Sequence, residues 1–268
     1  MPETEANGIT THYRFDGPAA APVVMLSNSL GTRLEMWDPQ IPALAARYRV
    51  LRYDSRGHGR TSAPTGPYGI ELLAQDAIAL LDALGLERVH FCGLSKGGAI
   101  GQLLGARHGR RLISLTLCAT ACRLGTQELW NERIAAVIEK GLPALVDGVT
   151  ERWFTKRYRE GAPAEVERVQ EMILSTPPQG YAASCAAIRD MDLCGLLGKI
   201  EVPTLVVAGE EDPATTPEIV REVHERIAGS RFVVVPRAAH LLNIEQAEVF
   251  NRTLLEFLNG RSKHGSGG

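Results

Sequence analysis

Short apolar runs alternate with amphipathic segments along most of this chain. Several runs have the length and composition of buried strands: 23–26, 49–53, 89–92, 112–118, 204–208 and 232–235. Between them, the segments 70–84 and 99–108 carry helical spacing. Strands that alternate with helices usually pack side by side in parallel. The pattern therefore predicts an α/β fold, with a mostly parallel central sheet flanked by helices.

The stretch 124–192 breaks this alternation. It contains helical segments but no apolar run with the character of a strand. We interpret it as a helical cap inserted into an α/β core, whose two parts are residues 1–123 and 193–262. The last residues, 263–268, are predicted to form a flexible tail.

A candidate nucleophile lies directly after the apolar run 89–92. The sequence Gly93-Leu94-Ser95-Lys96-Gly97 matches G-x-S-x-G, and a helical segment rich in small residues follows it. Glycines allow a sharp strand-to-helix turn that exposes the serine hydroxyl at a helix N-terminus. Backbone N–H groups there favour a developing negative charge. The motif and its context predict Ser95 as the nucleophile of an acyl-transfer reaction.

An acid and a histidine follow in the chain order that this motif requires. Asp212 comes after the run 204–208, and Glu210 and Glu211 beside it are competing candidates. His240 comes after the run 232–235 and precedes a helical segment. We predict that His240 takes the proton of Ser95 and that Asp212 orients the imidazole ring.

Two backbone N–H groups are expected to bind the oxyanion of the reaction. One belongs to Lys96, the residue after the nucleophile. The other should come from the loop after the run 23–26, where Leu30 is the best candidate.

Several segments together resemble the 3-oxoadipate enol-lactonase family of α/β-hydrolases. They are Leu26–Gly31, Arg52–Gly59, Phe91–Ser95, Arg152–Thr155 and Gly180–Tyr181. The resemblance extends from about Thr10 to Leu258, and it implies hydrolysis of a small enol-lactone to 3-oxoadipate in bacterial aromatic catabolism. It implies no cofactor and no metal. Lys96 departs from the family, which usually has methionine or another uncharged residue there.

The enol-lactone carries a carboxylate away from its reacting carbonyl, so a cation in the pocket is expected. Arg123, at the entry to the cap, is the first candidate, and Arg33 is the second. Trp130 and Trp153 are expected to line the cap side of the pocket. The segment 54–58 is expected to brace the loop beside the site.

The side chain of Lys96 has two interpretations. In one, its stem packs and its ammonium group reaches water. In the other, the cation alters the pocket or meets the substrate carboxylate.

Composition narrows the class of partner. The net charge of −2 and the absence of long runs of one sign exclude electrostatic steering toward nucleic acid or an anionic membrane. The sequence shows no signal peptide and no membrane-spanning run, so a cytoplasmic enzyme with a small-molecule substrate is expected. Whether it forms a homo-oligomer stays open. We interpret the five cysteines as small buried residues in a reducing compartment rather than as disulfides.

The triad alone leaves other functions open. A general carboxylesterase, a perhydrolase and a carbon–carbon bond hydrolase would use the same three residues. A non-catalytic binding protein on this scaffold is the alternative from another class.

Overall fold

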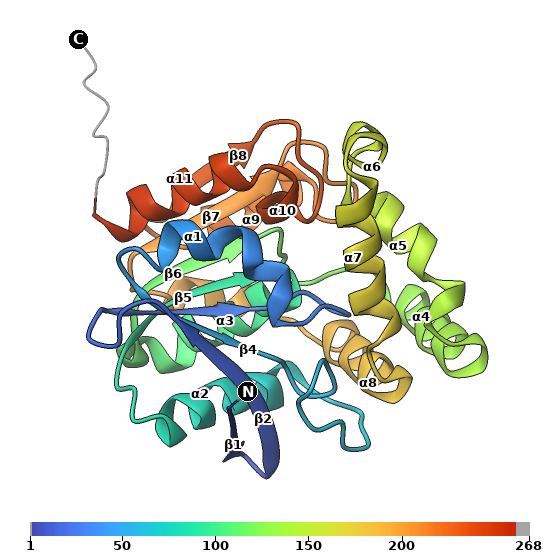
Figure 1. The fold of residues 1–268 in the computed structure, drawn as a ribbon, viewed down its shortest axis with the longest axis horizontal. Coiled ribbons are helices and arrows are strands. Elements are labelled where there is room, and N and C mark those ends of the chain that lie inside the picture. The colour runs from blue at the N-terminus through green and yellow to red at the C-terminus, as the bar shows by residue number, and fades with distance from the viewer. Residues whose placement is uncertain (1, 261–268) are drawn as a thin grey trace.

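An eight-stranded sheet forms the centre of the computed structural model, which describes residues 2–260 (Figure 1). Its strand order is β1-β2-β4-β3-β5-β6-β7-β8. The strands are β1 (Glu3–Ala6), β2 (Ile9–Asp16), β3 (Val23–Ser27), β4 (Arg49–Tyr53), β5 (Val89–Leu94), β6 (Leu112–Cys118), β7 (Thr204–Gly209) and β8 (Arg231–Val235). Neighbours from β4 to β8 pair in parallel, while β2 pairs with β1 and β4 in the antiparallel sense. The predicted α/β fold with a mostly parallel sheet is confirmed.

The apolar runs of the sequence correspond to β3 through β8. Every residue of β3, β5 and β7 is buried, because helices cover both faces of a parallel sheet. The sequence did not predict the β1–β2 hairpin, because its strands are largely polar and partly exposed. An edge hairpin of this kind lacks the continuous apolar run that marks a buried strand.

Helices surround the sheet and continue beyond one end of it. Those of the core are η1 (Leu34–Gln40), α1 (Ile41–Leu44), α2 (Ile70–Ala83), α3 (Lys96–His108), η2 (Gly109–Arg111), η4 (Cys194–Lys199), α9 (Pro217–Glu225), α10 (Leu242–Glu245) and α11 (Ala247–Leu258). Helix α3 packs on β5, β6 and α2, while α1 packs on β4 and α11.

The segment between β6 and η4 contains helices and no strand within the described residues. Its elements are α4 (Gln127–Lys140), η3 (Leu142–Ala144), α5 (Val146–Trp153), α6 (Lys156–Gly161), α7 (Pro163–Leu174) and α8 (Pro178–Arg189). Helices α4 to α8 gather at the right of Figure 1, beyond one end of the sheet. We call this group the cap. The predicted tail 263–268 lies outside the described residues.

A disulfide joins the two ends of the cap segment. Cys122 follows β6, Cys194 begins η4, and their Cα atoms are 4.9 Å apart. The interpretation of all five cysteines as unpaired core residues is therefore wrong for these two. Their separation of 72 residues gives no local signal for the pairing. The other cysteines, Cys92, Cys118 and Cys185, are free and buried.

Across residues 2–260, no helix combines the length and the apolar character needed to cross a bilayer.

Candidate active site

Ser95 lies between β5 and α3 in a backbone conformation that few residues adopt. Its φ is 56° and its ψ is −113°, which is strained for a residue with a side chain. Gly93 and Gly97 allow this turn: a Cβ on Gly97 would overlap the Ser27 carbonyl oxygen, and one on Gly93 would overlap the carbonyl of Gly97. The turn places Ser95 at the N-terminus of α3, as the motif predicts.

Backbone and side-chain hydrogen bonds hold this strained turn. The Ser95 N–H donates to the Cys118 carbonyl at 2.8 Å. The Ser95 carbonyl accepts from the Ala99 N–H at 3.0 Å and from Thr120 Oγ1 at 2.9 Å. The neighbouring strand β6 therefore fixes the position from which the Ser95 side chain projects.

Asp212 and His240 meet on the loops after β7 and β8. Asp212 Oδ2 lies 2.8 Å from His240 Nδ1, and both side chains are buried. Thr215 Oγ1 donates to the same carboxylate oxygen at 2.6 Å, while the N–H groups of Ala214 and Thr215 donate to Oδ1. The carboxylate is held at both oxygens, so it can fix the orientation of the imidazole ring.

The surroundings of Asp212 favour its ionised form. Burial raises the pKa of its carboxyl group, but the charge of His240 and the hydrogen bonds from His240 and Thr215 outweigh this effect. The net pKa lies below its ordinary value. Since an ionised carboxylate only accepts hydrogen bonds, His240 Nδ1 donates to Asp212 and Nε2 points away from it.

The competing acids, Glu210 and Glu211, are both exposed. Glu210 accepts a hydrogen bond from the Arg237 N–H instead. The structure thus pairs His240 with Asp212 and not with its acidic neighbours.

Ser95 and His240 line one cavity of about 650 Å³ between the sheet and the cap. Ser29 and Leu30 line the same cavity. Trp153 of α5 stacks against the His240 ring with 6.0 Å between ring centroids, and its carbonyl accepts from the Leu241 N–H at 3.1 Å. The cap therefore helps to position the loop that carries His240.

The loop after β3 places Leu30 at this cavity. The Gly31 N–H donates to His58 Nε2 at 2.9 Å, and the Ser29 N–H contacts Met36 Sδ at 3.4 Å. Within residues 2–260, the N–H groups of Leu30 and Lys96 donate no hydrogen bond. These are the two amides that the sequence assigned to an oxyanion.

His58 and Asp54 brace this loop, as the sequence analysis expected of their segment. His58 accepts from Gly31 through Nε2, while Nδ1 lies 3.1 Å from the Arg56 carbonyl. Burial, followed by the charge of Lys96, lowers the pKa of His58 well below its ordinary value, so the ring is neutral. Asp54 accepts from the Leu34 N–H at 2.8 Å.

The side chain of Lys96 does not reach water. It is only 1% exposed, and Nζ lies 3.3 and 3.4 Å from the two ring nitrogens of His58. The interpretation that its ammonium group extends into solvent is therefore wrong. Burial lowers the pKa of Lys96 to about 7, although the charges of Cys185 and Asp54 oppose the shift.

The predicted substrate-binding residues divide into two groups. Trp130 and Trp153 line the cavity, whereas Arg123 and Arg33 do not. Arg123 is 64% exposed and forms an ion pair with Asp192. Arg33 forms an ion pair with Glu35 at 3.0 Å. The expectation that either arginine faces the cavity is not met, because each turns to a carboxylate outside it.

Two other arginines line the cavity, and neither was predicted from the sequence. Arg133 comes from α4 and Arg152 from α5. Thr215, the partner of Asp212, was also missed. Its place three residues after the acid was a usable signal, because hydroxyl side chains commonly bond to nearby backbone and side chains in such turns. The arginines gave no comparable signal.

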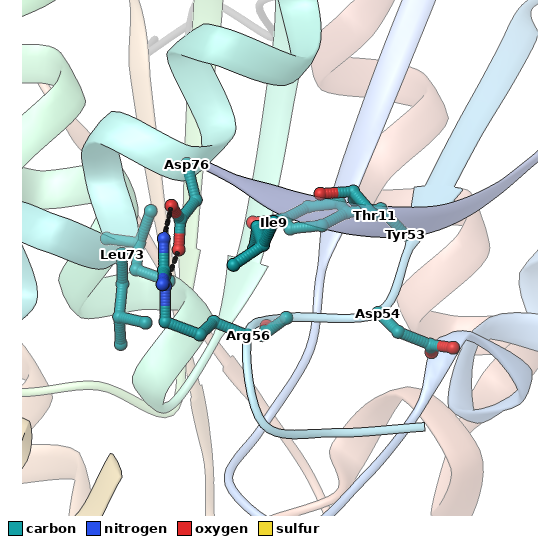
Figure 2. Close-up of a pocket in the computed structure, with 9 residues that line it drawn as sticks. Ile9, Thr11, Tyr53, Asp54, Arg56, Leu73 and Asp76 are labelled. Atoms are coloured by element: carbon teal, nitrogen blue, oxygen red, sulfur yellow. Dashed lines mark hydrogen bonds and ion pairs between the residues drawn. The ribbon is translucent and has the colours of Figure 1, made fainter. Parts of the chain in front are cut away.

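A second hollow, around Arg56, is part of the scaffold (Figure 2). Its free volume is close to 0 Å³. Arg56 donates to both carboxylate oxygens of Asp76, at 2.6 and 2.7 Å, and this pair fills the space. In the described part of the chain, no three His, Cys, Asp or Glu side chains are grouped to hold a metal ion.

Comparisons with known proteins agree on one family. Residues 22–247 match the family model described as the alpha/beta hydrolase fold. The chain is 37% identical to 3-oxoadipate enol-lactonase 2 and 38% identical to 3-oxoadipate enol-lactonase 1, both of Acinetobacter baylyi. These alignments cover 93% and 92% of each chain, respectively. A solved enol-lactonase from Burkholderia xenovorans LB400 is 45% identical, with a TM-score of 0.95 over 96% of this chain and 100% of that one. The similarity thus extends over both the sheet and the cap.

Proposed function

The chain belongs to the α/β-hydrolase family, and from this premise we propose that it is a serine hydrolase that opens 3-oxoadipate enol-lactone through an acyl-enzyme on Ser95. One observation carries the proposal: the Asp212–His240 hydrogen bond ends at the cavity that Ser95 also lines. The names of the similar enol-lactonases support the choice of substrate.

The reaction begins when Ser95 Oγ attacks the lactone carbonyl. His240 Nε2 takes the hydroxyl proton, and Asp212 stabilises the imidazolium ion that forms. The carbonyl oxygen becomes an oxyanion, which the N–H groups of Leu30 and Lys96 bind. Both amides are unpaired in the described residues, so they need not break a bond first.

Collapse of the tetrahedral intermediate breaks the ring C–O bond. The leaving group is an enolate of the same molecule. It takes the proton that His240 accepted from Ser95, and the resulting enol converts to the ketone, so the ring opening is hard to reverse. Water, activated by His240, then attacks the acyl-enzyme and releases the second carboxylate. The product is 3-oxoadipate.

Replacement of the nucleophile tests this mechanism. Ser95→Ala is expected to lower kcat on the enol-lactone by about 10³-fold or more, because it removes the covalent route. The assay is the loss of enzymatically generated 3-oxoadipate enol-lactone, and thermal unfolding shows whether the variant is folded. Near-normal turnover by a folded Ser95→Ala variant would overturn the mechanism.

The substrate is tested separately from the mechanism. A fluorophosphonate probe is expected to label Ser95 in the wild-type protein and to leave Ser95→Ala unlabelled. Turnover of the enol-lactone is then compared with turnover of p-nitrophenyl acetate. A labelled enzyme that hydrolyses the neutral ester and not the lactone would be a general carboxylesterase of the same family.

A further inference from the structure

We propose that Arg133 and Arg152 form a carboxylate-binding subsite on the cap side of the cavity. This inference rests on the proposed function, since it concerns the part of the substrate that does not react. It assigns the site a preference for lactones and esters that carry a negative charge away from the carbonyl.

Arg133 and Arg152 lack the carboxylate partner that the two arginines outside the cavity have. Arg123 pairs with Asp192, and Arg33 pairs with Glu35. Within residues 2–260, neither Arg133 nor Arg152 forms an ion pair with a carboxylate. Cationic side chains that face a cavity without a counterion are poised to bind an anion.

Arg133 is held in place by neutral aromatic groups. Its Nε and Nη2 atoms donate to the Tyr181 hydroxyl, the first at 3.0 Å. The guanidinium carbon also lies 5.4 Å from the centroid of the Trp130 ring. Burial raises the pKa of Tyr181 to about 12, so its hydroxyl stays neutral and cannot balance the charge of Arg133. The side chain is thereby oriented but not neutralised.

Arg152 experiences this unbalanced charge. It donates no hydrogen bond within the described part of the chain. Burial, followed by the positive charge of Arg133, lowers the pKa of its guanidinium group. Glu132 also lines the cavity, and within residues 2–260 it forms an ion pair with neither arginine. The charge of Glu151 offsets this pKa shift only in part, and a ligand carboxylate would supply further negative charge.

The position of the pair fits a small substrate with two ends. Ser95 and His240 line the sheet side of the cavity, and the two arginines come from the cap helices α4 and α5. A molecule in this cavity can present its carbonyl to Ser95 and its carboxylate to the cap at the same time. Guanidinium groups bind carboxylates through two parallel hydrogen bonds, which would also fix the orientation of the ring.

A charge-selective assay tests the subsite. Arg152→Met is expected to lower kcat/KM on 3-oxoadipate enol-lactone by about 10–100-fold, mainly through KM, because a charge-assisted hydrogen bond to the substrate is lost. The loss on neutral p-nitrophenyl acetate should be much smaller. Arg123→Met is the matched control, since it removes an arginine that pairs outside the cavity, and it should leave both activities near wild type. Equal losses on both substrates, or the same loss in Arg123→Met, would overturn the proposal.

A binding assay separates this proposal from the proposed function. Adipate should protect wild-type Ser95 from fluorophosphonate labelling, and Arg152→Met should need at least about 10-fold more adipate for the same protection. Arg133→Lys keeps the positive charge but loses the planar guanidinium group. The adipate concentration that protects this variant should lie between those for the wild type and Arg152→Met. If Ser95 is not labelled at all, the proposed function fails, and calorimetric titration with adipate still measures the subsite. If adipate does not bind to the wild-type protein, the proposed subsite is wrong. This outcome does not depend on whether the protein is a serine hydrolase.

Discussion

The sheet side and the cap side of the cavity are built in different ways. On the sheet side, backbone groups hold the key residues: Ser95 bonds to β6 through its N–H, and Asp212 accepts two N–H groups from the turn that follows it. On the cap side, Arg133 of α4 is placed by its hydrogen bonds to Tyr181 of α8, a contact between side chains of separate helices. The first arrangement is local and rigid, and the second depends on how α4 and α8 pack together.

This difference separates reaction from selection. Residues that move a proton or bind an oxyanion must be placed accurately, and backbone hydrogen bonds at the ends of strands provide that accuracy. Residues that choose a substrate need only line the cavity with suitable charge and shape. Under the proposed function, changes on the sheet side should affect kcat or folding, and changes on the cap side should affect the range of substrates.

The strongest test of the sheet side is Asp212→Asn. We expect kcat to fall by about 10³–10⁴-fold, because an amide in this position favours the wrong imidazole tautomer and stabilises no imidazolium ion. Glu211→Gln, one residue away and exposed, should retain wild-type activity. Steady-state kinetics on the enol-lactone measures both. An Asp212→Asn variant with more than a tenth of wild-type kcat would contradict the role of this carboxylate.

A pair of glycine substitutions compares the rigidity of the two sides. Gly97→Ala should destabilise the fold by about 2–4 kcal/mol, because the added Cβ overlaps the Ser27 carbonyl and the backbone must move. Gly161 lies in cap helix α6, and no atom is near its Cβ position. Gly161→Ala should therefore raise the free energy of unfolding by about 0.5–1 kcal/mol. Urea unfolding monitored by circular dichroism gives both values. If the two substitutions changed the free energy of unfolding by similar amounts, the proposed difference in rigidity between the two sides would be wrong.

Lys96→Met should give the most pH-dependent effect. The folded-state pKa of about 7 lies below the ordinary value of 10.5, so the unfolded chain binds more protons between these values. Wild-type stability should therefore rise as the pH increases from 7 toward 10.5. Removal of the amine should stabilise the protein by about 1–3 kcal/mol at pH 6 and by less at pH 10.

The measurement for Lys96→Met is the difference in unfolding free energy between variant and wild type at both pH values. A difference that grows with pH would show that the amine is not the cause. Activity on the enol-lactone should persist, since the amide of residue 96 remains.

The sequence identified the sheet side because its signals are local. The residues around Ser95 form a motif, and Asp212 and His240 each follow an apolar run at the same edge of a parallel sheet. The structure brings Ser95 and His240 to one cavity and Asp212 to the far side of the imidazole ring, and their catalytic roles stay proposals. The alternation of strands and helices likewise determined the fold class, which needs no knowledge of individual contacts.

The cap side was less predictable because its contacts join distant residues. Arg123 and Arg133 are ten positions apart and look equivalent in the sequence. What distinguishes them is the ion pair of Arg123 with Asp192, a residue 69 positions further along the chain. The disulfide and the burial of Lys96 depend in the same way on tertiary contacts. No periodicity or local motif encodes these pairings.

The bond between Cys122 and Cys194 makes the cap a covalently closed ring on the sheet. A protease that cuts one peptide bond anywhere within residues 123–193 would leave a single molecule, with both halves of the cap still attached where they began. Release of a fragment would take a second event, the reduction of that bond. On a denaturing gel, a single cut in the cap would therefore become visible only after a thiol reduces the disulfide.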